Sequence, residues 1–238
     1  MPRFAVGVGY ALYRGPSADG SFHRHAAFQI AIAAGAAAGG EVGMVDSGDT
    51  CHRGAVLLVP PMVRHRMLPT EDQLTFFVDP HCAFADRLRR RCGPGITAAP
   101  ELHELGEGDV RRAGARPSGE LDPRLLAAMD TLADRDVPMP DLAAGVGLSP
   151  QRLRALARDQ LGLPLVRWRL WLHLRRAAEA LHEGRSPADA AVAGGFADQA
   201  HFTRQMRELI GLTPAAVLPV LRPSSAARDV HRDRAAER

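Results

Sequence analysis

One motif occurs twice in the C-terminal half of the chain, and this repeat constrains the fold more than any other sequence feature. The two copies read DLAAGVGLSPQRLRALARDQLGLP and DAAVAGGFADQAHFTRQMRELIGLTP. Each begins with an aspartate, small apolar residues and a glycine before leucine or phenylalanine. Each continues through a polar N-cap and a helical stretch to Gly-Leu and a proline. The closing prolines, Pro164 and Pro214, are 50 residues apart. The pattern indicates an internal duplication of one short unit.

The second copy, from Ser186 to Pro214, predicts two short helices joined by a glycine turn. Ser186 is a good N-cap, Pro187 suits the first helical position, and Asp189 completes a capping box. Gly194-Gly195 ends the first helix, because glycine can adopt a positive φ at a sharp corner.

The following helix, from about Asp198 to Leu209, has an apolar face and polar faces. Phe202, Met206 and Leu209 recur at helical spacing. The polar and basic side chains left for the other faces include Gln199, Thr203, Arg204 and Arg207. A helix, a tight turn and a helix of this kind are typical of the helix-turn-helix motif, whose second helix enters the major groove of DNA.

Between the two copies, Leu165–Glu183 is a predicted helix without internal glycine or proline. About 18 residues at a rise of 1.5 Å span roughly 27 Å. This length is near the about 34 Å that separates successive major-groove faces on one side of DNA. A rigid spacer of this size can let two recognition helices enter adjacent grooves.

Residues 141–220 resemble the double helix-turn-helix domain of the AraC/XylS family of bacterial transcription regulators. The resemblance rests on LAAGVGLSPQRLRAL, on LRRAAEAL between the copies, and on ADAAVAGGFADQAHFTRQMRELIGLTP. It implies that the following side chains face DNA: Gln151, Arg152 and Arg154 in the first unit, and Gln199, Thr203 and Arg204 in the second. Bidentate hydrogen bonds from glutamine to adenine and from arginine to guanine provide the chemistry.

The resemblance also implies phosphate contacts by Arg207, Arg169 and Arg175, which position the protein without reading sequence. The chain departs from the family pattern in the first unit. Ala155 stands where a basic residue is common, and Ala157 stands where an aromatic residue is common. We therefore expect the first unit to read sequence mainly through Gln151 and Arg154.

Charge is distributed unevenly along the chain, whose 30 basic residues are all arginine. Residues 1–140 hold 15 arginines and 17 acidic residues, a net charge of −2. Residues 141–222 hold 11 arginines and 7 acidic residues, a net charge of +4. A basic C-terminal part beside a slightly acidic N-terminal part is consistent with nucleic-acid binding.

The first 80 residues consist of short apolar or alternating runs separated by turn residues. The predicted strands are Phe4–Tyr10, Phe28–Ala33, Glu41–Val45, Ala55–Val59 and Leu74–Val78. Many short strands of this kind predict a small barrel or jelly roll.

Two stretches of this β region resemble the cupin motifs H-x-H-x3-E and G-x5-P-x-G-x2-H. They are HRHAAFQ, from His23 to Gln29, and GAVLLVPPMVRH, residues 54–65. Alternate residues of a strand share a face, so His23 and His25 can point into one cavity. The chain departs from the motifs in two places, because Gln29 replaces glutamate and Met62 replaces glycine.

Three interpretations of this histidine set stay open. His23, His25, Gln29 and His65 bind a divalent metal, or they line a pocket for a small ligand, or the barrel is purely structural. Imidazole is a suitable ligand for Zn, Fe, Ni or Mn. The expected fold class is α+β, a cupin-like β-barrel or jelly roll followed by an all-α double helix-turn-helix domain.

The patterns divide the chain into four segments. We expect a sensor domain at 1–95, a linker at 96–122, a DNA-binding domain at 123–221 and a disordered tail at 222–238. Within the DNA-binding domain the first unit covers about 140–163, the linker helix 165–183 and the second unit 186–214. Further helices are predicted at His81–Arg91 and at Arg124–Asp134. The arginines of the first contact phosphate, form a solvated face or lie at the rim of a dimer.

Composition excludes several classes of protein. No run approaches 18 apolar residues, and the glycine-broken N-terminal stretch is unlike a signal peptide. The three cysteines, Cys51, Cys82 and Cys92, make no disulfide framework. We expect a cytoplasmic protein that does not associate with a membrane.

The leading hypothesis is a transcription regulator, not an enzyme, controlled by a small ligand or metal in the barrel. The implied partners are promoter DNA, a small-molecule effector, RNA polymerase and a second copy of the chain. It would act at a promoter as an activator or a repressor. The alternatives are a metal-dependent cupin enzyme with an accessory helical domain, and a constitutive DNA-binding protein whose barrel only dimerises.

Overall fold

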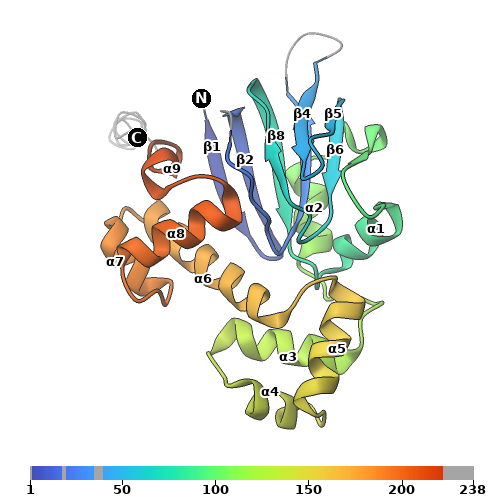
Figure 1. The fold of residues 1–238 in the computed structure, drawn as a ribbon, viewed down its shortest axis with the longest axis vertical. Coiled ribbons are helices and arrows are strands. Elements are labelled where there is room, and N and C mark those ends of the chain that lie inside the picture. The colour runs from blue at the N-terminus through green and yellow to red at the C-terminus, as the bar shows by residue number, and fades with distance from the viewer. Residues whose placement is uncertain (1, 18–19, 35–39, 222–238) are drawn as a thin grey trace, which may run out of the picture.

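The computed structural model describes residues 2–17, 20–34 and 40–221. In this part of the chain, two sheets with helices α1 and α2 form an N-terminal β domain. Helices α3 to α9 form a C-terminal domain beside it (Figure 1). Helix α6 runs along the boundary, with α3, α4 and α5 at one end and α7 and α8 at the other (Figure 1).

The β domain contains two antiparallel sheets. The larger has the strand order β1-β2-β8-β3-β6-β9 and the smaller β5-β4-β7. The strands are β1 Arg3–Gly7, β2 Tyr10–Ser17, β3 Phe28–Ala33, β4 Val42–Asp46, β5 Cys51–Gly54, β6 Val56–Val59, β7 His65–Met67, β8 Thr70–Val78 and β9 Thr97–Ala98.

The helices of the C-terminal domain begin where the sequence places proline or a polar cap. Asp122, Ser149, Ser186 and Asp198 each accept a backbone N–H at a helix start. The helices are α1 Ala83–Arg91, η1 Pro100–Leu102 (a short 3-10 turn), α2 Glu107–Gly114, α3 Pro123–Asp134, α4 Met139–Gly145, α5 Pro150–Leu161, α6 Leu165–His182, α7 Pro187–Ala193, α8 Gln199–Ile210 and α9 Pro214–Leu221.

Alternation along the strands gives the larger sheet two different faces. Phe28 and Ile30 of β3 pack with α1 and α2 on one face. Ala31 of β3 faces the other way and packs with Met44 of β4 in the core between the two sheets. The β domain is therefore layered as helices, larger sheet and smaller sheet.

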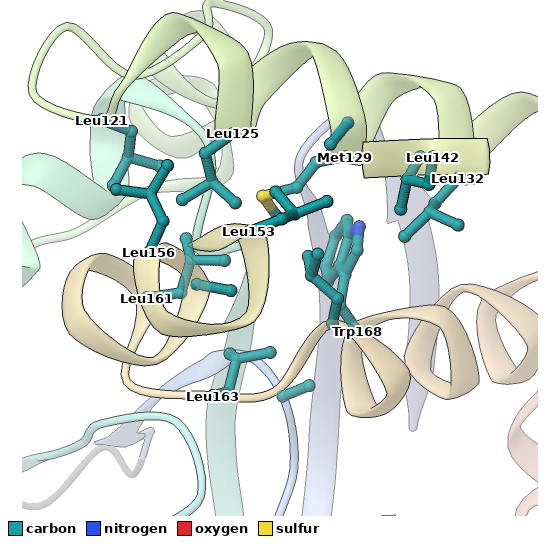
Figure 2. Close-up of a cluster of buried hydrophobic side chains, with 14 of the residues drawn as sticks. Leu121, Leu125, Met129, Leu132, Leu142, Leu153, Leu156, Leu161, Leu163 and Trp168 are labelled. Atoms are coloured by element: carbon teal, nitrogen blue, oxygen red, sulfur yellow. The ribbon is translucent and has the colours of Figure 1, made fainter. Parts of the chain in front are cut away.

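Helix α6 supplies side chains to two separate helical cores. Trp168 is fully buried and packs with Leu125 of α3 and Leu153 of α5 (Figure 2). Leu181, near the other end of α6, packs with Phe202 of α8. Each repeat unit thus has its own core, and α6 joins the two cores. None of the described helices is long and apolar enough to cross a membrane.

The structure does not contain the single continuous strand predicted at Phe4–Tyr10. A turn at Val8 and Gly9 divides this stretch into β1 and β2. Gly9 has φ +77°, and a Cβ on it would lie 2.3 Å from the Gly114 carbonyl oxygen. The turn requires glycine both for its backbone conformation and for its close approach to the end of α2.

The predicted linker, residues 96–122, is folded against the β domain. Strand β9 pairs with β6, and Val110 and Ala113 of α2 are buried in the core under the larger sheet. The sequence of α2, EGDVRRAG, does not show the apolar spacing of a helix, because this helix buries only one narrow face. The predicted disordered tail, 222–238, lies outside the described residues.

Candidate nucleic-acid interface and internal cavity

The first repeat unit consists of α4, a turn and α5. Ser149 caps α5 by accepting the backbone N–H of Arg152 at 3.2 Å. Leu153 is buried, whereas Gln151 and Arg154 are exposed, as is Arg152. The three side chains implied to face DNA therefore lie outside the core, near the N-terminus of α5.

Ala157, which replaces the aromatic residue common in the family, is fully buried in the core around Trp168. Ala155 is exposed beside Arg154. The alanine at position 157 therefore affects packing. The alanine at position 155 leaves that position of the exposed face of α5 without a basic group.

The second unit consists of α7, a glycine turn and α8. Ser186 accepts the N–H of Asp189 at 3.1 Å, as the capping box predicts. Gly195 has φ +78°, and a Cβ on Gly194 would lie 2.8 Å from the His173 carbonyl oxygen of α6. The Gly-Gly pair thus turns the chain and lets it approach α6 closely.

Gln199, Ala200, Arg204 and Arg207 of α8 are exposed. Thr203 is half-buried, and its hydroxyl donates to the Gln199 carbonyl oxygen at 2.8 Å within the same helix. The α8 face therefore presents Gln199 and Arg204 to the outside, while the Thr203 hydroxyl is already hydrogen-bonded.

Arg175, implied as a phosphate contact, points instead at the β domain. Its guanidinium pairs with buried Asp79, which follows β8, and donates to the Gly7 carbonyl oxygen at 2.9 Å. Asp79 also accepts the indole N–H of Trp171 at 3.0 Å. These contacts fasten α6 to the β domain. We call Asp79, Trp171 and Arg175 the interdomain latch.

A cavity of about 450 Å³ lies between the larger sheet and helices α6, α8 and α9. Most of its wall is apolar, and both domains contribute to it: Phe4, Ala11, Tyr13, Met67 and Phe77 from the β domain, and Trp171, Leu174, Ala178, Met206 and Ile210 from the helices. Gln73 and Thr75 of β8 also line it. Gln73 Oε1 and Thr75 Oγ1 are buried and have no hydrogen-bond partner among the described residues. Such atoms favour a ligand that supplies the missing partners.

The structure brings the four predicted cupin-motif residues together, and two of them, His23 and Gln29, line this cavity. His23 and His65 form an antiparallel backbone bridge, with N···O distances of 2.9 and 3.0 Å. Gln29 Oε1 lies 2.8 Å from Nε2 of both His25 and His65. Burial lowers the pKa of all three imidazoles, that of His25 to about 4, so they are neutral at pH 7.

Met62 explains one departure from the motif. It has φ +65°, the left-handed conformation that glycine favours, and its N–H donates to the His25 carbonyl oxygen at 2.9 Å. The turn that the motif builds with glycine is therefore formed here by methionine.

The segment that carries His23 also contacts the C-terminal end of α8. Ser21 Oγ donates to the Gly211 carbonyl oxygen at 3.3 Å, and the Arg24 N–H donates to the Glu208 carbonyl oxygen at 3.3 Å. A Cβ on Gly211 would lie 2.6 Å from His23 Nδ1. The segment Ser21–Arg24, with His23, and the C-terminal end of α8 are thus in direct contact.

The sequence comparisons agree with the repeat. Residues 142–218 match a family model described as a helix-turn-helix domain. The arabinose operon regulatory protein of Escherichia coli (strain K12) is 36% identical over 87 residues, which is 36% of this chain and 30% of the relative. The protein of the same name from Salmonella typhimurium (strain LT2) is also 36% identical over 87 residues, 31% of its length. The chain thus covers less than a third of these relatives.

Solved structures match over most of the chain. ToxT of Vibrio cholerae strain SCE256, with bound unsaturated fatty acid, superposes with a TM-score of 0.58 at 12% identity, over 92% of this chain and 98% of that one. ToxT from strain O395, bound to (E)-4-(8-methylnaphthalen-1-yl)but-3-enoic acid, gives 0.56 at 8% identity, over 90% and 99%. At these identities the likeness shows the fold alone, and it confirms the expected α+β organisation.

The β domain is joined to two helix-turn-helix units on one connecting helix. The matches over the C-terminal part support the resemblance of this part to the DNA-binding domain of the AraC/XylS family, as the repeat predicted.

Proposed function

We propose that the chain is a sequence-specific DNA-binding transcription regulator, located in the cytoplasm, whose two recognition helices read one promoter site. The observation that carries the proposal is the exposure of Arg154 on α5 and Arg204 on α8, at opposite ends of the 18-residue helix α6. At 1.5 Å per residue α6 spans about 27 Å. Gln151 and Gln199 stand beside these arginines, and Arg152, Thr203 and Arg207 complete the proposed contacts.

Selection from a random pool of DNA duplexes tests this function. The full chain should enrich DNA duplexes that share two groups of preferred base pairs. These two groups should lie about one helical turn, roughly 10 base pairs, apart. Affinity should fall steeply with salt, because arginines that neutralise phosphates release counterions. Failure to enrich any sequence, with binding equal to that of random DNA, would contradict the proposal.

We further propose that a small ligand in the cavity controls this binding. Both domains form the cavity wall, and α8 forms part of it, so a ligand there contacts a recognition helix directly. The mostly apolar wall and the two unpartnered atoms, Gln73 Oε1 and Thr75 Oγ1, fit a molecule with an apolar body and a polar end. Relatives of this fold have been solved with an unsaturated fatty acid and with an aryl butenoic acid.

A long-chain unsaturated fatty acid and the matching alcohol are suitable probes. At a concentration 100 times its Kd, a bound probe should stabilise the full chain by about 2.7 kcal/mol, measured by thermal unfolding. Thr75→Val should weaken that binding about fivefold by removing one hydrogen bond. It should not destabilise the ligand-free protein, because the hydroxyl has no hydrogen-bond partner in the part of the chain that the structure describes. No stabilisation by either probe, in both wild type and variant, would contradict an amphipathic ligand in this cavity.

A further inference from the structure

A second, more polar cleft lies at the boundary between the two domains, and its volume is about 500 Å³. The β domain contributes the turn at Val8 and Gly9, His81 and the segment 114–117 at the end of α2. The helical domain contributes residues of α3 and α6. Among the described residues, Arg175 is the one that lines both this polar cleft and the apolar cavity. The two spaces are therefore separate sites on neighbouring faces of α6.

Two residues that line the polar cleft each have a buried ring nitrogen without a hydrogen-bond partner among the described residues. The atoms are Trp168 Nε1 and His81 Nδ1. The two rings pack edge to face, with their centroids 4.9 Å apart, and Trp168 is fully buried. A polar group that is buried without a partner costs free energy. The pair therefore favours a molecule in the cleft that supplies the missing partners.

The chemistry of the two nitrogens limits what this molecule can be. The Trp168 indole N–H can only donate, so it requires an acceptor such as a carboxylate oxygen. Burial lowers the pKa of His81, so its ring is neutral at pH 7. A neutral ring uses Nδ1 either as a donor or as an acceptor. A ligand that carries both a carboxylate and an amine can satisfy the indole N–H and either tautomer of His81.

The charged side chains of the cleft favour the same kind of ligand. Asp79 and Arg175 pair with each other. The other charged lining residues make no ion pair within the part of the chain that the structure describes, and they are Arg116, Arg176, Asp130 and Glu179. Two positive and two negative charges thus remain for a ligand. An anion alone would meet two carboxylates and a cation alone would meet two guanidinium groups, so a dipolar molecule fits best.

We propose that the polar cleft binds a small zwitterion of the amino-acid class. Its carboxylate accepts from the Trp168 indole N–H and from Arg116, and its ammonium group donates to Asp130 and Glu179. Charge-assisted hydrogen bonds of this kind are the strong ones in proteins. This inference goes beyond the proposed DNA-binding function and does not rest on it. Because both domains form the walls, a bound amino acid would contact both of them.

Thermal unfolding of the full chain, with each of the protein amino acids added in turn, tests whether such a ligand binds. At least one of them should raise the midpoint of unfolding, and calorimetric titration then gives its Kd. The N-acetyl derivative of that amino acid lacks the ammonium group, and the amide derivative lacks the carboxylate. Each derivative should bind at least about tenfold more weakly than the parent, because each loses charge-assisted hydrogen bonds.

Two exposed residues of the cleft test the orientation of the ligand. Glu179→Gln and Arg116→Gln should each weaken binding of the parent amino acid about tenfold. Glu179→Gln should not weaken the N-acetyl derivative further, and Arg116→Gln should not weaken the amide derivative further. Glu104→Gln is the matched control, because Glu104 is also exposed but does not line the cleft, and it should bind as wild type does.

The possible outcomes separate the proposal from its alternatives. If no amino acid stabilises the full chain, or if both derivatives bind as tightly as the parent, the proposal is wrong. If Arg116→Gln and Glu179→Gln both bind as wild type does, the amino acid binds elsewhere and the proposal is also wrong. Trp168→Phe keeps an aromatic ring without the N–H and should bind about tenfold more weakly; if it does not fold, the two exposed variants decide. DNA affinity is not part of these measurements, so this site and the proposed regulator function fail independently.

Discussion

Replacing Asp79 with alanine should lower the free energy of unfolding of the full chain by about 3–5 kcal/mol. The carboxylate is 1% exposed and has two partners on α6, the Trp171 indole N–H and the Arg175 guanidinium. Among the described residues, its removal leaves the partly buried Arg175 cation with only the Gly7 carbonyl oxygen, and the Trp171 indole N–H with no acceptor. Chemical denaturation followed by fluorescence of the two tryptophans measures the change.

Asp72→Ala is the matched control for this prediction. Asp72 also pairs with an arginine, Arg14 at 3.2 Å, but both side chains are exposed. A pair of this kind contributes about 0–1 kcal/mol. Equal losses in the free energy of unfolding of the two variants would show that the interdomain latch contributes no more to stability than an exposed ion pair. Asp79→Asn should recover part of the loss, because it keeps an acceptor for Trp171.

Replacing both Arg154 and Arg204 with alanine should weaken specific DNA binding by about 2–6 kcal/mol. A good bidentate contact to a base contributes about 1–3 kcal/mol of discrimination. The two residues lie in different repeat units with separate cores, so their effects should add. Fluorescence anisotropy on the selected duplex, at one fixed salt concentration, measures the change.

Arg111→Ala controls for the general loss of positive charge. Arg111 is exposed on α2 in the β domain, away from both repeat units. It should change affinity by less than about 0.5 kcal/mol, as is usual for a surface substitution. A double variant that binds as wild type does, or no more weakly than Arg111→Ala, would remove these arginines from the interface.

Local sequence signals predicted the helical domain well because its elements are bounded by local chemistry. Ser149, Ser186 and Asp198 cap helices as expected, and Gly162 and Gly211 end α5 and α8 in the left-handed conformation. Each signal acts within a few residues of its own position. The same applies to β3, Phe28–Ala33, whose apolar run lies in the centre of the larger sheet.

The elements that were missed depend on distant contacts. Strand β5, with the sequence CHRG, has no apolar pattern and exists because it pairs with β4. Helix α2 gains its stability from the sheet that it covers. Helix α9 contains Pro219, a residue that argues against a helix when the sequence is considered alone.

The candidate sites divide in the same way. His23, His25, Gln29 and His65 were predictable because two motifs mark them. The interdomain latch was not, because Asp79 and Trp171 are 92 residues apart in the chain and no local pattern links them. The sequence also did not indicate Gln73 and Thr75 as site residues, because a polar residue in a predicted strand ordinarily faces solvent. Only the fold shows that this face of β8 lines a cavity.

The central claim is that the two repeat units read two parts of one site, and comparing the sequence preferences of two single variants tests it most directly. DNA selection should be carried out in parallel with wild type, Arg154→Ala and Arg204→Ala. Arg154→Ala should lose base preference in only one of the two groups of preferred base pairs, and Arg204→Ala in only the other group. Each variant should lose it at about one base pair. Loss of base preference in the same group by both variants, or preferences identical to wild type in both, would contradict the claim that the two repeat units contact two parts of one site.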